Sequence, residues 1–99
     1  MHVSSRKILR EFCQLHSDGC ESVYNWYLVA EKATWTNLVE VQSLYKSAEA
    51  VGNFTVFNIR GNRYRLIVDL IYRRQVIYVK YILTHSEYDK EVWKNDDYF

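Results

Sequence analysis

The residues with the clearest chemical potential are six cations in the middle of the chain. Residues 57–80 contain a single acid, Asp69, against Arg60, Arg63, Arg65, Arg73, Arg74 and Lys80. His85 and Tyr88 follow shortly after this basic stretch. Arginine binds phosphate oxygens with a planar, permanently charged fork, and histidine is the usual proton carrier near neutral pH. These residue types suit cleavage of an RNA phosphodiester, in which charge builds on the phosphate while a proton moves.

Within this set we expect Arg65 and Lys80 to stabilise the phosphate and His85 to move a proton as acid or base. Tyr88 would stack on a base or assist the proton transfer. The sequence has no CxxC, HExxH, Walker A or GxGxxG segment and no acidic cluster with two-metal spacing, so neither a metal nor a cofactor is expected. A plainer interpretation stays open, because arginines on a strand are usually a solvated face and a lone histidine is usually a surface or capping residue.

Length and composition limit the class of protein. A chain of 99 residues predicts a single domain over residues 1–99, and 48% apolar with 25% charged residues is typical of a globular protein. The net charge of +1 does not by itself mark a nucleic-acid binder, so only the local clustering of cations favours one. No segment is long and apolar enough to cross a membrane or to form a signal-peptide core, which predicts a cytoplasmic protein. Cys13 and Cys20 lack metal-binding or CxxC spacing, and we expect free, packed thiols rather than a disulfide.

Hydrophobic periodicity separates the chain into a helical first third and a sheet-forming second half. Apolar residues at helical spacing predict helices over 5–16 and 20–33, joined by Asp18-Gly19, followed by an irregular region 35–50 with one helical turn around 38–44. From about residue 51 the period changes to two, which predicts strands over 54–60, 64–72 and 75–84 and a helical turn within 87–94. The expected fold class is α+β, with two N-terminal helices packed on one face of an antiparallel meander.

Alternation along the strands assigns side chains to faces. A two-residue loop at Gly61-Asn62 pairs position 60 with 63 and 58 with 65, and a second loop at Arg73-Arg74 pairs 72 with 75 and 67 with 80. In this register one open face carries Asn58, Arg60, Arg63, Arg65, Lys80 and Ile82, and the helix-facing side carries Ile77, Val79, Tyr81 and Leu83. The acidic, aromatic segment 90–99 would either fray, as is more usual, or cover the basic face or a partner.

Two motifs carry a resemblance to a known family. The segment Phe57 to Leu66 reads FNIRGNRYRL, and Thr84 to Asp89 reads THSEYD. Together, at this spacing, they resemble the HigB family of RelE-like toxins. The resemblance implies a compact RelE-type fold and cleavage of mRNA, commonly on the translating ribosome. It also implies a helix-turn-helix antitoxin as the neutralising partner. The net charge of +1 departs from the more basic character usual for RelE-like toxins.

The resemblance also suggests roles for single residues. Arg65 falls where RelE-like toxins place a phosphate-binding arginine, Lys80 matches a basic strand position, and His85 and Tyr88 match the C-terminal pair of the family. We expect the remaining polar residues to contact RNA, with Asn58, Arg60 and Arg63 orienting mRNA and Arg73 and Arg74 contacting ribosomal RNA. Two alternatives stay open: a non-catalytic RNA- or protein-binding module of the same fold, or a basic face that serves only antitoxin binding.

Overall fold

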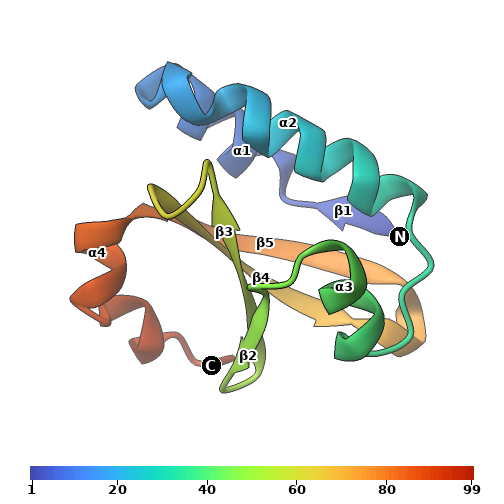
Figure 1. Ribbon diagram of the computed structural model, residues 1–99. Coiled ribbons are helices and arrows are strands. Elements are labelled where there is room, and N and C mark those ends of the chain that lie inside the picture. Colours follow the sequence, from blue (N-terminus) through green and yellow to red (C-terminus); the bar gives the residue numbers. More distant parts are fainter.

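The computed structural model describes residues 1–99 as a five-stranded sheet with helices on both of its faces (Figure 1). The strand order is β1-β5-β4-β3-β2. The strands are β1 (His2–Ser4), β2 (Glu49–Val51), β3 (Phe54–Ile59), β4 (Tyr64–Ile71) and β5 (Val76–Thr84). The helices are α1 (Arg6–Leu15), α2 (Ser17–Lys32), α3 (Leu38–Leu44) and α4 (His85–Asp89), with 3-10 turns η1 (Tyr72–Arg74) and η2 (Val92–Asn95). The predicted α+β class, with two N-terminal helices on one face of the sheet, is confirmed.

The first helical layer buries apolar side chains at helical spacing against the sheet. Leu9 and Phe12 of α1 and Val23 and Trp26 of α2 belong to the main core, which also receives the apolar side chains of β3, β4 and β5. The predicted start of the second helix at residue 20 is wrong, because α2 already begins at Ser17.

Gly19 therefore lies inside the first turn of α2 and is not part of the connection between the two helices, as the sequence suggested. A Cβ atom at this position would lie 2.8 Å from ring atoms of both Phe12 and Tyr64. That separation is too short for two carbon atoms, so only glycine lets the start of α2 approach these two rings. The residue is explained by close packing and not by the end of a helix.

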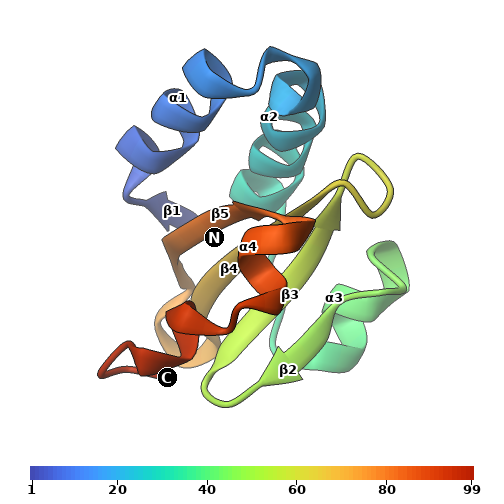
Figure 2. The ribbon, with the colours of Figure 1, turned by 90° about the vertical axis from the view of Figure 1, so that its left-hand side faces the viewer.

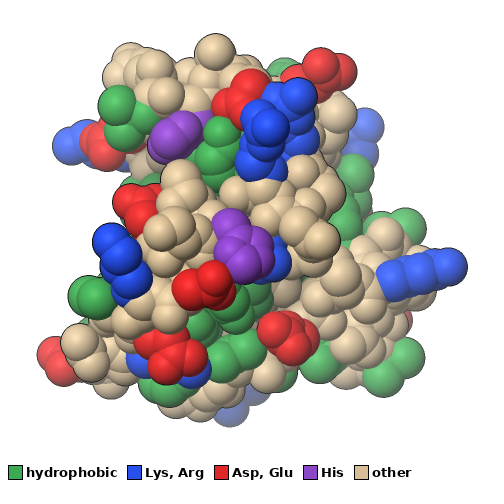
Figure 3. All heavy atoms as spheres, turned by 60° about the vertical axis from the view of Figure 1, so that its left-hand side comes forward, with side chains coloured by type: hydrophobic (Ala, Val, Ile, Leu, Met, Phe, Trp, Pro, Cys, Tyr) green, Lys and Arg blue, Asp and Glu red, His purple; other side chains and the backbone are tan.

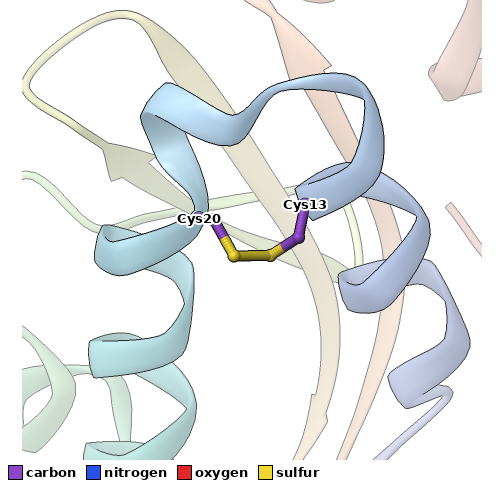
Figure 4. The surroundings of a disulfide bond; sticks show 2 residues. All are labelled: Cys13 and Cys20. Atoms are coloured by element: carbon purple, nitrogen blue, oxygen red, sulfur yellow. A yellow bond between two sulfur atoms is a disulfide. The ribbon is translucent and has the colours of Figure 1, made fainter.

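The prediction of free thiols is also wrong, because Cys13 and Cys20 form a disulfide (Figure 4). Cys13 lies in the last turn of α1 and Cys20 in the first turns of α2. The chain reverses at His16, which brings the two Cα atoms to 4.7 Å, within the range that a disulfide needs. A spacing of seven residues gives no such proximity within one helix, so only the reversal creates it.

The register of the β3–β4 hairpin follows the prediction. Asn58 lies opposite Arg65 and Ile59 opposite Tyr64, and Gly61 adopts the positive φ of 64° that the turn requires. The sheet is not wholly antiparallel, however, because the short strand β1 adds to its edge in parallel to β5. No sequence pattern predicts β1, since three residues are too few to show alternation.

The β4–β5 pairing departs from the prediction through a β-bulge. Val68 pairs with Val79 but Ile67 pairs with Tyr81, so the extra residue of the bulge is Lys80. Beyond this point β5 is out of phase by one residue, and its side chains exchange faces. Tyr81 and Leu83, expected toward the helices, pack on the opposite face, and Ile82, expected on that face, packs into the main core.

The face that we expected to be open is covered by the C-terminal segment (residues 90–99). Trp93 is buried there against Phe54, Val56 and Ile67 of the sheet, and Tyr88 and Phe99 pack around the same cluster. The chain end is fixed by its backbone, since the amide of Asn53 donates to the carbonyl oxygen of Phe99 at 2.7 Å. Frayed ends do not bury aromatic rings in this way, so the expectation of fraying is wrong. Figure 2 shows α4 and the C-terminal segment in front of the strands, with α1 and α2 at the top of the view.

Candidate active site beside α4

Strand pairing brings Arg65 and the His85–Tyr88 pair to the same end of the sheet. Arg65 lies opposite Leu83 in β5, two residues before His85. The backbone amide of His85 donates to the carbonyl oxygen of Arg63 at 3.3 Å, which joins the start of α4 to the end of the β3–β4 turn. Residues twenty positions apart in sequence are therefore neighbours in space.

The direction of α4 is set by a capping box that the sequence Thr84-His85-Ser86-Glu87 encodes. The hydroxyl oxygen of Thr84 accepts a hydrogen bond from the amide of Glu87 at 3.2 Å, and the Glu87 carboxylate accepts one from the amide of Thr84 at 2.9 Å. A helix of five residues is too short to persist by propagation alone, so these two bonds stabilise it. His85 and Tyr88, three residues apart, consequently project from neighbouring positions on one side of α4.

Arg65 carries a positive charge that no carboxylate neutralises. Its Nη1 donates to the backbone carbonyl oxygens of Asn62 at 2.9 Å and Tyr64 at 3.3 Å, and Arg65 takes part in none of the ion pairs of the molecule. Its Cζ lies 5.5 Å from the centre of the Tyr88 ring. Carbonyl oxygens and an aromatic face hold the half-buried guanidinium in place without cancelling its charge, so it can still attract an anion.

Tyr88 is held between Arg65 and the C-terminal segment. Its ring stacks on that of Trp93 with the centroids 5.1 Å apart and the planes at 16°, and the indole N–H of Trp93 donates to the Tyr88 carbonyl oxygen at 3.0 Å. Burial, followed by the nearby charge of Glu49, raises the pKa of the Tyr88 phenol above its usual value. The phenol therefore remains protonated at neutral pH and can act as a hydrogen-bond donor.

His85 has a partner that the sequence reasoning missed. Its Nδ1 lies 2.9 Å from Oδ2 of Asp89, four residues later in α4, and both side chains are more than half exposed. A proton on Nδ1 that points at Asp89 leaves Nε2 as the free acceptor. The signal was present in the sequence as a histidine and an aspartate one helical turn apart.

Lys80 is engaged by the C-terminal segment and not by the site around Arg65. Its Nζ lies 3.3 Å from Oδ2 of Asp96, with side-chain exposures of 23% and 11%, and 4.9 Å from the centre of the Tyr98 ring. A hydrogen bond from the Tyr98 amide, then one from the Tyr81 hydroxyl and the charge of Lys80, lower the pKa of Asp96. Lys80 lies about 10 Å along β5 from Leu83, the strand partner of Arg65. Its side chain therefore pairs with Asp96 and does not lie beside Arg65.

Arg60 and Arg63 share a carboxylate on the helical layer. Nη1 of each lies 2.8 Å from Oδ2 of Asp18, and the Tyr64 hydroxyl donates to Oδ1 of the same residue at 2.6 Å. The Tyr64 hydrogen bond and then the Arg63 hydrogen bond, with the charges of both arginines, lower the pKa of Asp18 from 3.8 to about 2. Asp18 thus ties the β3–β4 turn to the start of α2 and partly neutralises two cations that we expected to be free.

The remaining predicted RNA contacts lie at different places. The side-chain amide of Asn58 donates to Oδ1 of Asn62 at 3.1 Å, beside Arg65. Arg73 and Arg74 belong to η1, at the opposite end of β4. The eight residues of that strand separate them from the His85 end by about 25 Å. Both are exposed and neither forms an ion pair, so they cannot contact the same phosphate as Arg65.

The surface on this side of the molecule is mixed in charge. Figure 3 shows basic and acidic side chains interspersed around the histidine side chains, without a continuous basic patch.

No group of three or more His, Cys, Asp or Glu side chains is arranged to hold a metal ion. None of the helices has the length and apolar character required to cross a membrane.

Comparison with known proteins identifies one family. Residues 20–91 match the model of the HigB_toxin family, described as the RelE-like toxic component of a toxin–antitoxin system. The matched range contains most of α2, most of the sheet, and α4 with His85 and Tyr88. No curated protein matches the chain significantly.

Proposed function

Since the chain belongs to the HigB family of RelE-like toxins, we propose that it is a metal-independent endoribonuclease that cuts mRNA on the translating ribosome. The observation that carries this proposal is the position of Arg65. Its unneutralised guanidinium lies against Tyr88 at the end of the sheet where His85 begins α4. A cation, an exposed imidazole and a protonated phenol at one end of the sheet could stabilise the phosphate charge and move the protons of RNA transesterification.

The proposed step moves two protons and exchanges one bond to phosphorus. The 2′-oxygen attacks the adjacent phosphorus, the bond from phosphorus to the 5′-oxygen breaks, and a 2′,3′-cyclic phosphate and a free 5′-hydroxyl result. Nε2 of His85 takes the proton from the 2′-hydroxyl, with Nδ1 oriented by Asp89. The leaving 5′-oxygen receives a proton from the phenol side of the site, where Tyr88 is the donor. Arg65 stabilises the charge that grows on the phosphate oxygens.

The other polar residues have supporting roles in this proposal. Asn58 lies opposite Arg65, and Arg60 and Arg63 lie in the β3–β4 turn. These three residues would orient the RNA strand, although both arginines are shared with Asp18. Arg73 and Arg74, at the far end of the sheet, would contact ribosomal RNA. Lys80 is paired with Asp96, so we assign the phosphate contact to Arg65 alone.

The family also supplies a partner and a setting for the proposed activity. A toxin–antitoxin system contains an antitoxin, which we propose to be a helix-turn-helix protein that neutralises the toxin. Cleavage of mRNA on the ribosome would take place in the cytoplasm. The proposed chemistry needs no cofactor, because the nucleophile is part of the substrate.

Purified protein added to translating ribosomes tests the activity directly. We expect cuts within the mRNA, mapped by primer extension, that leave a 2′,3′-cyclic phosphate. Arg65→Ala and His85→Ala should each slow cleavage by about 100-fold or more, the scale of lost electrostatic or acid–base catalysis. Arg10→Ala is the matched control, since this exposed arginine lies on α1, across the sheet from the site. Folded Arg65→Ala and His85→Ala variants that cut as fast as the parent would refute these roles. A parent protein without any cleavage would instead be a non-catalytic binding module.

A further inference from the structure

A groove runs between α1 and α2 on the outer side of the helical layer. Its volume is about 660 Å³. Its apolar lining comes from both helices and consists of Leu9, Cys13, Cys20, Val23, Tyr24 and Tyr27. The disulfide lies at the end of the groove where α1 passes into α2. Grooves of this size and character between two helices are common binding sites for amphipathic segments.

The helix beside the groove exposes apolar side chains that nothing in the chain covers. The inward stripe of α2 consists of Val23, Trp26 and Ala30. On its outer side Tyr24 is 58% exposed, and Leu28, one turn further along, is exposed as well. The opposite face of the sheet is different, because there the C-terminal segment buries the apolar side chains. The helical layer therefore keeps apolar side chains exposed beside the groove, and such surfaces commonly mark a protein interface.

The charges around the groove indicate what kind of partner fits. Arg6 and Arg10 of α1 form one wall, and neither has a carboxylate within ion-pair distance. Arg6 donates instead to the hydroxyl of Tyr27 at 3.0 Å, which holds its guanidinium at the groove. Glu21 is the only acid in the lining. An apolar floor with a basic wall is complementary to a helix that is apolar on one side and acidic along one edge.

We infer that the groove between α1 and α2 is the docking site for an amphipathic, acidic helix of the antitoxin. An antitoxin is the partner that membership of a toxin–antitoxin family implies. The groove lies on the helical side of the sheet, and Arg65, His85 and Tyr88 lie on or beside the other side. A helix bound in the groove therefore leaves the proposed RNA site uncovered.

The test measures affinity for the antitoxin, using the protein encoded beside the toxin gene as the probe and calorimetry at 50 and 300 mM salt as the assay. Tyr24→Glu places a charge in the apolar lining and should weaken binding at least tenfold. Arg10→Glu should weaken binding about tenfold at low salt, with a smaller difference at high salt where charges are screened. Val39→Glu on α3 is the matched control for Tyr24, since Val39 is 75% exposed, and Lys46→Glu is the control for Arg10. Neither control should change the affinity.

Circular dichroism first establishes that all four variants are folded. Unchanged affinity for both groove variants, or an equal loss in both controls, overturns the assignment. A second copy of the chain in the groove would also overturn it, and sedimentation would show this as a dimer that Tyr24→Glu converts to a monomer. Binding is measured without RNA, so the result does not depend on the proposed cleavage. If the protein cuts no mRNA but only its groove variants lose affinity for the antitoxin, the docking site is still supported.

Discussion

Trp93→Ala tests whether the C-terminal segment is a structural layer that positions the site. The indole is 4% exposed, lies between Tyr88 and Phe99, and donates its N–H to the Tyr88 carbonyl oxygen. Removing a buried tryptophan costs about 3–5 kcal/mol. The C-terminal segment can detach instead of leaving a cavity, which sets the loss near the lower end, about 3 kcal/mol. This is a large part of the roughly 5–15 kcal/mol that stabilises a domain.

The assay is urea denaturation combined with mRNA cleavage. Val92→Ala is the control, because the neighbouring side chain is 66% exposed and its loss should cost less than about 0.5 kcal/mol. Trp93→Ala should also slow cleavage, since Tyr88 loses the ring on which it stacks and Arg65 then loses its aromatic support. Two results would show this reasoning to be wrong: a cost under about 1 kcal/mol, or full cleavage by a destabilised variant. The first would mean that the segment is not packed, and the second that Trp93 does not position Tyr88.

Three further predictions concern acids and the disulfide. Because the pKa of Asp18 is lowered to about 2, its contribution to stability is present above about pH 4 and is lost as the pH falls through about 2; denaturation curves at pH 5 and 2.5 should show this, and Asp18→Asn should remove that part of the pH dependence. The bond between Cys13 and Cys20 closes a loop with a sequence separation of 7. Reducing it should lower the free energy of unfolding by about 2 kcal/mol and the Tm by about 10 °C. Reductant should have no effect on a Cys13→Ser, Cys20→Ser double variant. Asp89→Asn should lower kcat about tenfold at unchanged KM, because Asp89 orients His85 without touching RNA, whereas a similar effect of Asp97→Asn would point to general loss of negative charge.

Much of the architecture could be predicted because it depends on neighbouring residues. The change of hydrophobic period near residue 51 separates helices from strands, and Gly61 in the turn fixes which residues of β3 and β4 are opposite each other. The motif around Thr84 contains both halves of a capping box within four residues. Features that span only a few neighbouring residues can be predicted from the sequence, since dihedral preferences and side-chain alternation act over that distance.

The state of each charged side chain was decided only by the tertiary structure. Asp18 lies more than forty positions from Arg60 and Arg63, and Asp96 reaches Lys80 because the C-terminal segment packs across the sheet. A single bulge at Lys80 then reverses the faces of the residues that follow it in β5. The sequence by itself determined which cations the chain carries and which elements hold them. Whether each cation is neutralised or left free, as Arg65 is, depends on contacts between distant segments, because electrostatic pairing requires proximity that only folding provides.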